Sequence, residues 1–255
     1  MDIPDRIEID GRSARVHDLW GAVFGHGHFT AMQVRGGRTR GLDLHLRRLE
    51  AATQELFERG LDGDVVRERI RRALGDTQDA SIRVYVFLPD REPSVIVTVR
   101  PPGGIPTAPQ RLELVRFQRP QAHLKHVGFV HVDHTELARA HGFAGAVLVT
   151  SDGHISEAAI ANIGFFEGST VVWPDAPHLD GITMQLLERT LAERGTPSRR
   201  APVRLTDVPA LDGAFLSNAR GIVPVGSLGD VALTVNAERM RSLHDAYGSV
   251  SWDEI

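Results

Sequence analysis

Residues 144–166 read AGAVLVTSDGHISEAAIANIGFF. Two apolar runs, at 144–150 and 160–166, are separated by a stretch that opens with the turn sequence Ser-Asp-Gly, and short apolar runs bounded by such turns are typical of buried strands. The acidic residue Glu157 lies between the two predicted strands. This stretch therefore predicts part of a sheet with a carboxylate between two of its strands.

The chain around this stretch has 255 residues, enough for one large domain or two small ones. Strands and helices are mixed without strict alternation, which predicts the α+β class. Residues 101–109, PPGGIPTAP, hold four prolines and two glycines, which exclude regular structure and indicate a linker. We expect a small N-terminal domain over 1–100, that linker, and a larger C-terminal domain over 110–255.

Hydrophobic periodicity predicts the elements of both domains. In the first domain we expect a hairpin turning at Asp10-Gly11, strands at 29–34, 81–89 and 94–100, and helices at 42–60 and 62–75. The helix at 42–60 should end at Gly60 and bury Leu44, Leu46, Leu49, Ala52 and Leu56. In the second domain we expect strands at 111–117, 144–150, 160–166, 170–174, 213–218 and 221–225, and helices at 132–141, 182–195 and 237–250.

Composition excludes several classes of protein. No apolar run reaches about 18 residues, so we expect no membrane span. The absence of cysteine excludes disulfides, thiolate zinc sites and cysteine nucleophiles. A net charge of -4 offers no basic field for a nucleic acid. The N-terminus resembles no secretory signal, and we expect a soluble, cytoplasmic protein.

One position stands apart in charge chemistry. Of the 29 lysine and arginine residues, a single one is lysine, Lys125. Biased codon usage explains an excess of arginine, but not why one amine remains. Only an ammonium group can lose its proton and attack a carbonyl. The count alone leaves open whether Lys125 has such a role.

Other common chemistries find little support. Four histidines lie close together but lack the spacing of a helical zinc motif, so we expect no metal site; they are His123, His126, His131 and His134. Ser217 has no nucleophile-elbow pattern around it. Neither a P-loop nor a dinucleotide-binding glycine motif occurs.

Lys125 and Glu157 together suggest cofactor chemistry. Pyridoxal phosphate needs a lysine for its Schiff base, an acid beside its ring nitrogen and a cradle for its phosphate. Residues 181–183, Gly-Ile-Thr, open a predicted helix and offer such a cradle. The alternative is that residues 181–183 are an ordinary helix start and that Glu157 is an acid on the surface.

Five ordered blocks carry a resemblance to a known family: FGHGHFTAMQV, HLRRLEAA, LKHVGFV, SDGHISEAAIANIGFF followed by DGITM, and FLSNARGIVPV. Over residues 24–225, and with Glu157 32 positions after Lys125, the chain resembles the fold-type IV pyridoxal-phosphate enzymes, or aminotransferase class IV. That family includes branched-chain and D-amino acid aminotransferases and 4-amino-4-deoxychorismate lyase.

The resemblance implies a two-domain α+β fold like that of D-amino acid aminotransferase, a homodimer, and pyridoxal 5'-phosphate bound between the domains. It implies that Lys125 holds the cofactor as an internal aldimine and that Glu157 contacts the pyridine nitrogen. The other implied cofactor-binding residues are Arg48, Asn162, Ile182, Thr183, Asn218 and Ala219. For Asn162, closing a turn by hydrogen bonding is an equal alternative.

Departures from the family pattern fall around the substrate. His28 and Phe29 are expected to line the substrate pocket, and Phe29 replaces a tyrosine common in the aminotransferases. Gly128-Phe129 also departs from the pattern. The implied reaction transfers an amino group between an amino acid or amine and a 2-oxo acid. One alternative is a lyase of the aminodeoxychorismate type, which the Phe29-Thr30 pair favours. A second is a catalytically inactive homologue that binds the cofactor.

Overall fold

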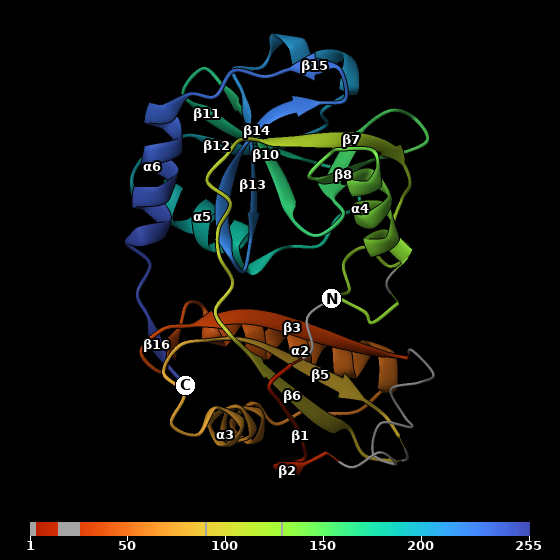
Figure 1. Ribbon diagram of the computed structural model, residues 1–255, viewed down its shortest axis with the longest axis vertical. Coiled ribbons are helices and arrows are strands. Elements are labelled where there is room, and N and C mark those ends of the chain that lie inside the picture. The colour runs from red at the N-terminus through yellow and green to blue at the C-terminus, as the bar shows by residue number, and fades with distance from the viewer. Residues whose placement is uncertain (1–3, 15–25, 90, 129) are drawn as a thin grey trace. The chain divides into compact units, whose positions relative to one another are not determined.

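The computed structural model describes residues 4–14, 26–89, 91–128 and 130–255, which form two compact units (Figure 1). Unit 1 comprises the described parts of Met1–Gly104 with Leu124–Gly128 and Ser251–Ile255. Unit 2 comprises those of Ile105–His123 and Phe129–Val250. The change from one unit to the other after Gly104 falls inside the predicted linker. Lys125, however, packs with unit 1 and not with the C-terminal domain to which its sequence position assigned it.

Unit 1 contains a five-stranded antiparallel sheet in the order β2-β1-β6-β5-β3. Its strands are β1 (Arg6–Ile9), β2 (Arg12–Ser13), β3 (Gly27–Val34), β5 (Ala80–Phe87) and β6 (Ser94–Arg100). The predicted hairpin forms between β1 and β2. Asp10 and Gly11 take φ values of 47° and 75°, the left-handed conformations that a two-residue hairpin turn requires.

Two helices, α2 (Leu42–Phe57) and α3 (Gly63–Leu74), cover one face of this sheet (Figure 1). The side chains that alternate toward them make an apolar core that includes Met32, Val84 and Val97. Asp62 caps α3, since its carboxylate accepts a hydrogen bond from the N–H of Asp64 at 2.8 Å.

The buried face of α2 differs from the prediction. Leu49 and Ala52 are buried as expected, but Leu44, Leu46 and Leu56 are only partly buried, and the residues buried beside the sheet include His45, Thr53 and Phe57. Polar partners on β3 satisfy the two polar residues among these, so the helix can turn them inward at low cost. The helix ends at Phe57 instead of continuing to Gly60.

Residues 124–128 pair with the outer edge of β3. The N–H of Phe29 donates to the carbonyl of Lys125 at 2.9 Å, and the N–H of Val127 donates to the carbonyl of Gly27 at 2.8 Å. These two bonds extend the sheet by a short antiparallel segment. They hold the backbone of Lys125, the only lysine of the sequence, next to β3.

The C-terminal residues also return to unit 1. Strand β16 (Asp253–Glu254) pairs with β4 (Arg38–Thr39), and Ile255 enters the apolar core. The first residue before α2, Gly41, supplies no side chain to cap the helix. Asp253 does so instead, because its carboxylate accepts the N–H of Leu42 at 2.9 Å.

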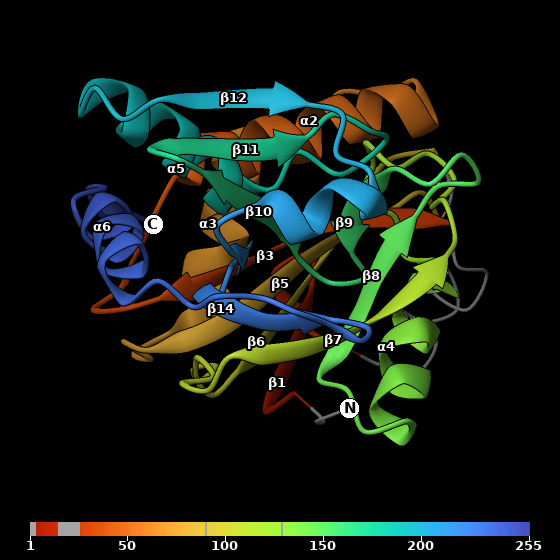
Figure 2. The same cartoon turned by 90° about the horizontal axis from the view of Figure 1, so that it is seen from above.

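Unit 2 is built on a curled sheet in the order β12-β11-β10-β13-β14-β7-β8-β9, with β15 paired to β14 (Figure 2). Its strands are β7 (Gln110–Arg116), β8 (Gly145–Val149), β9 (Ile155–Ala158), β10 (Asn162–Glu167), β11 (Thr170–Pro174), β12 (Ser198–Ala201), β13 (Ala214–Asn218), β14 (Gly221–Leu228) and β15 (Val231–Ala232). The two ends of the sheet meet, since the N–H of Ile155 donates to the carbonyl of Val203 at 2.9 Å. One apolar core lies within this curl.

Three helices pack on unit 2: α4 (Val130–Ala140), α5 (Ile182–Glu193) and α6 (Ala237–Gly248); a short 3-10 turn, η2, spans Leu205–Ala210. A second core joins α5 and α6 to the sheet, and a third lies under α4. The α+β class is confirmed. Strands β9 and β12 were not predicted. The sequence of β12 is SRRA, which lacks apolar alternation. No helix in the described ranges is long and apolar enough to cross a membrane.

Replacing Asp253 with Ala should lower the free energy of unfolding of unit 1 by about 1 kcal/mol, because the first turn of α2 loses its cap. Glu254→Ala is the matched control. Its ion pair with Arg38 is exposed, so its loss should cost less than about 0.5 kcal/mol. Urea unfolding followed by circular dichroism measures both, and equal effects would contradict the capping role of Asp253.

Candidate functional site

The only lysine of the chain lies against an aromatic ring in unit 1. Lys125 Nζ is 4.8 Å from the centre of the Phe29 ring, within the range of a cation–π contact. Phe29 itself stacks on Tyr85, with 5.3 Å between ring centres. Lys125 and Phe29, each named separately as a site residue from the sequence, are thus brought together.

Alternation along β3 separates Phe29 from its neighbours. His28 and Thr30 point toward α2, where His28 is 1% exposed and Thr30 is fully buried. The hydroxyl of Thr53 donates to the carbonyl of Leu49 at 2.8 Å, so it accepts its second hydrogen bond, at 2.9 Å, from His28 Nε2. His28 is therefore part of the packing under β3, and its expected place in the substrate pocket is not supported.

Two cations surround a neutral imidazole in the same unit. His45, on α2, is fully buried and shares a 2.6 Å hydrogen bond with the hydroxyl of Thr30. Burial, together with the charges of Arg48 and Lys125, lowers the pKa of His45 to about 3. Arg48 and Lys125 thus share an electropositive region that suits an anion.

Arg83 is a further cation near this group that the sequence analysis did not identify. Its guanidinium carbon is 5.9 Å from the centre of the Phe29 ring, and its Nη1 donates to the hydroxyl of Tyr85 at 3.3 Å. The alternation of β5 was a usable signal, because it places Arg83 on the face opposite the apolar core.

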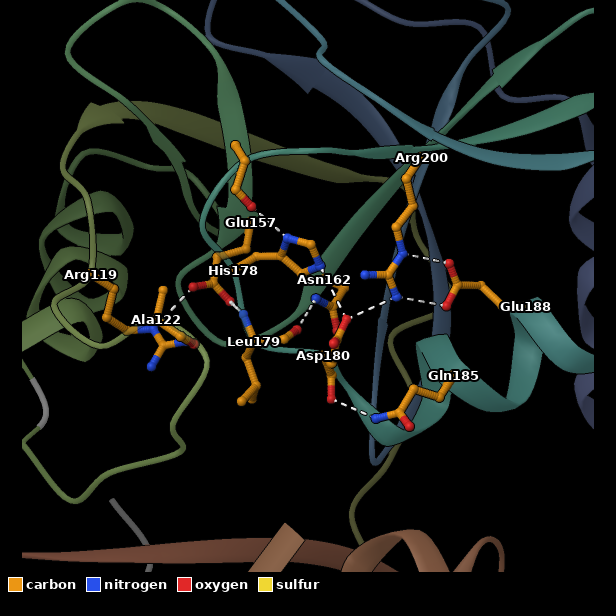
Figure 3. A network of polar contacts seen from close by, with 11 residues as sticks. Arg119, Ala122, Glu157, Asn162, His178, Leu179, Asp180, Gln185, Glu188 and Arg200 are labelled. Carbon is orange, nitrogen blue, oxygen red and sulfur yellow. Dashed lines mark hydrogen bonds and ion pairs between the residues drawn. The ribbon is translucent and has the colours of Figure 1, made fainter. Parts of the chain in front are cut away.

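In unit 2, Glu157 is held by a buried ion pair (Figure 3). Arg119 Nε lies 3.0 Å from Glu157 Oε1, and the side chains of the two residues are 5% and 7% exposed. The N–H of Leu179 donates to the other oxygen at 3.2 Å, and Arg119 also donates to the carbonyl of Ala122. A carboxylate has about four acceptor positions, so Glu157 can accept a further N–H. Arg119 was missed, since nothing in its local sequence marks it.

The start of α5 forms a second part of this site. Gly181 caps the helix without a side chain, and the first helical hydrogen bond runs from the N–H of Gln185 to its carbonyl. The N–H groups of Ile182 and Thr183 precede that bond and have no partner within the helix. Thr183 is buried, and its hydroxyl donates to the carbonyl of Asn218 at 2.8 Å. Such a helix start fits an anion.

Asn162 connects the two parts of the unit 2 site. Its amide donates to the carbonyl of Leu179 at 2.7 Å, and any side chain at Gly181 would collide with its Oδ1. Asn162 therefore positions the residues that lead into α5. Asn218 accepts the N–H of Arg220 at 2.9 Å, which closes the turn that contains Ala219.

Further ion pairs hold the same segment from its other side (Figure 3). Arg200 bonds Asp180 at 2.9 Å and Glu188 at 3.0 Å. His178 Nε2 lies 3.4 Å from Asp180. The contact with His178, reinforced by Arg200, holds the pKa of Asp180 below its usual value. Residues 178–180, just before α5, are thus held by charged side chains on two sides: Glu157 on one and Arg200 on the other.

The six unit 2 residues predicted from the sequence therefore form one connected group. In unit 1, Lys125 contacts Phe29, and the charges of Arg48 and Lys125 both act on His45. Phe24, Gly25 and Phe129 lie outside the described residues. Within the described part of the chain, no group of three or more His, Asp or Glu residues is arranged to hold a metal ion.

Comparisons with known proteins agree on one family. A family model described as amino-transferase class IV matches residues 27–228, most of the chain. The branched-chain amino acid aminotransferase from Escherichia coli has a TM-score of 0.83 at 18% identity, over 98% of this chain and 95% of that chain. The 4-amino-4-deoxychorismate lyase from Pseudomonas aeruginosa has a TM-score of 0.81 at 25% identity, over 94% and 97%.

A third similar structure is a hypothetical aminotransferase from Mycobacterium tuberculosis in its PLP-bound form. It has a TM-score of 0.83 at 17% identity, over 96% of this chain and 98% of that chain. A search of curated proteins returned no match.

The buried histidines predict acid sensitivity. Burial lowers the pKa of His28 to about 4 and that of His45 to about 3, from an ordinary value of 6.5. Below about pH 6.5 these histidines bind protons in the unfolded chain but stay neutral in the folded chain. The free energy of unfolding therefore falls as pH decreases. At pH 5 the loss should be about 2 kcal/mol for each histidine.

Urea unfolding of unit 1 at pH 7 and pH 5 measures this loss, and His28→Leu should remove the share that belongs to His28. The control is His244→Leu on α6, where the side chain is exposed. An unchanged pH dependence in His28→Leu would contradict the assignment.

The buried pair in unit 2 predicts a non-additive double mutant. Arg119→Met should cost about 3 kcal/mol, because it leaves the Glu157 carboxylate buried without its cation. Adding Glu157→Leu should restore part of that stability, since no unpaired charge remains. A double mutant less stable than Arg119→Met would show that the two side chains are not coupled in this way.

Proposed function

Because the chain belongs to the amino-transferase class IV family, we propose that it is a pyridoxal-phosphate enzyme that transfers an amino group between an amino acid or amine and a 2-oxo acid. The observation that carries this proposal is the place of Lys125. It is the only lysine in the sequence, and two backbone hydrogen bonds hold its segment beside Phe29 on β3.

The residues of both units suit the parts of this cofactor. The phosphate would bind to Arg48 and to the first N–H groups of α5, from Ile182 and Thr183. Asn218 and Ala219 would complete that cradle in the neighbouring turn. We propose that both groups of residues act on the same cofactor molecule, in a homodimer.

Glu157 would accept the N–H of the pyridine ring with the acceptor positions that Arg119 and Leu179 leave open. Arg119 is then a positioning residue, because its hydrogen bond holds the carboxylate in one orientation. Pyridoxal phosphate, when bound, supplies an electron sink for the substrate.

Lys125 would have two tasks. Its Nζ would be the point of covalent attachment of the cofactor, and its amine would take up the proton that leaves the substrate Cα. The ring of Phe29 under Nζ shields it from water on one side. Arg83, beside the same ring, would bind the carboxylate of the substrate and so orient its Cα toward Lys125.

A lyase of the aminodeoxychorismate type is the second candidate. It is favoured by the similarity to the Pseudomonas aeruginosa lyase, which has the highest identity of the three structures described. The Phe29-Thr30 pair also favours it, and Thr30 points toward α2 and bonds His45. That residue is part of the packing below β3.

Reduction with sodium borohydride tests the proposal directly. In the protein loaded with pyridoxal phosphate, reduction should fix the cofactor to Lys125, and peptide mass spectrometry should find it there. Since the chain has no other lysine, Lys125→Arg should show no attachment to any side chain and should lose turnover by at least about 100-fold. Attachment in wild type at the N-terminal amine alone would overturn the assignment.

The visible spectrum separates the candidate reactions. A band of the loaded protein that an amino acid or amine bleaches, and that a 2-oxo acid restores, supports amino transfer. Release of pyruvate without an acceptor supports the lyase. A band that no donor changes supports an inactive homologue.

A further inference from the structure

His178 lies in the segment of unit 2 that leads into helix α5 (Figure 3). Its side chain is 9% exposed, and its Nδ1 lies 2.6 Å from the carbonyl oxygen of Ala176. Because a carbonyl oxygen only accepts hydrogen bonds, Nδ1 carries a proton whether the ring is neutral or charged. The proton that His178 gains or loses is therefore the one on Nε2.

The other ring nitrogen faces a carboxylate. Nε2 is buried, lies 3.4 Å from Asp180 Oδ1, and has no other partner among the described residues. In the neutral ring, Nε2 is an acceptor opposite an oxygen that also only accepts, so neither atom satisfies the other. In the imidazolium, the N–H of Nε2 can donate to Asp180 in a charge-assisted contact. The geometry thus favours the charged ring.

Two acids near His178 stabilise its charge. The contact with Asp180 makes the largest contribution, Glu157 adds to it, and together they raise the pKa of His178 above its usual value although burial opposes them. The other charged groups nearby are each paired with one of these acids or with a cation beside it: Arg119 with Glu157, Arg200 with Asp180, and Glu188 with Arg200.

We propose that the imidazolium of His178 is the positioning group of this segment, which holds Leu179 against Glu157 and keeps the acid aligned with the start of α5. The inference rests on the proposed function and adds a residue to its site. Leu179 is the connection, because its N–H donates to Glu157 at 3.2 Å and its carbonyl accepts the amide of Asn162 at 2.7 Å.

The pH dependence has a definite sign. When Nε2 releases its proton to water, Asp180 keeps Arg200 but loses the second of its two cations. A contact that raises the pKa of a histidine stabilises fully below about pH 6.5 and is lost as the pH rises through the pKa of the folded protein. Leu179 should therefore be held less firmly in weakly alkaline solution.

Amide hydrogen exchange of the full chain tests this without cofactor. The protection factor of the Leu179 N–H should fall by about 10-fold between pH 6 and pH 8.5, because a hydrogen bond to a charged group is lost. His178→Gln should remove this pH dependence. The matched control is His154→Gln, which breaks a 2.8 Å contact with Asp152 elsewhere in unit 2 and should leave the pH dependence of Leu179 as in wild type.

Asp180→Asn separates the charge effect from simple packing. Its amide nitrogen can donate to the neutral ring of His178, while its oxygen can still accept from Arg200. Leu179 should therefore stay protected at pH 8.5 in this variant, with a protection factor that does not change with pH. A flat profile in wild type, an unaltered pH dependence in Asp180→Asn, or an Nε2–H tautomer of neutral His178 by NMR would each overturn the proposal.

Binding of pyridoxamine 5'-phosphate supplies a second readout, since this form of the cofactor cannot attach to Lys125 covalently. The dissociation constant of wild type relative to that of Asp180→Asn should rise by about 10-fold from pH 6 to pH 8.5. Relative to His154→Gln it should stay constant. A ratio to Asp180→Asn that does not change would overturn the link to the cofactor. Binding to none of the proteins would count against the proposed function, and the exchange of Leu179 would still decide the role of His178.

Discussion

The pairing of residues 124–128 with the edge of β3 is the constraint on which the unit 1 site depends. It satisfies an edge that would otherwise be open, and it places the amine of Lys125 over a ring of β3. Strand alternation then assigns every other side chain: Phe29 faces the lysine, while His28 and Thr30 face α2. A slip of one residue in this pairing would turn Lys125 to the other face of the sheet, away from Phe29.

Unit 2 uses charge for a similar purpose. Glu157 is buried with Arg119, and its second oxygen holds the N–H of Leu179, two residues before the cap of α5. The acid and the helix start are thus parts of one hydrogen-bonded assembly and not two independent features. Asn162 reinforces it from the neighbouring strand. An arrangement of this kind holds its donors and acceptors in place before a ligand arrives.

Much of this could be predicted from the sequence, and the reasons for the rest are physical. Helices α2, α3 and α5 followed from periodicity and the first hairpin from Asp10-Gly11, and the family expected from the five blocks is confirmed. The buried side of α2 was wrong in part, because polar partners on β3, distant in sequence, allow His45 to turn inward. Arg119 could not be identified from the sequence for the same reason. Its role depends on its ion pair with Glu157, which lies 38 residues away in the chain.

Unit 1 is assembled from three separate pieces of chain, since Leu124–Gly128 and Ser251–Ile255 complete a sheet and a core begun before Gly104. During synthesis on a ribosome, the first hundred residues emerge with one strand edge unpaired and helix α2 uncapped. The edge can pair once residues 124–128 are translated, but helix α2 stays uncapped until all of unit 2 has been translated. Long-range contacts of this kind slow folding and prolong the exposure of an open edge. The described residues of unit 2 are interrupted in sequence only by Leu124–Gly128. Unit 2 can therefore fold before unit 1 is complete.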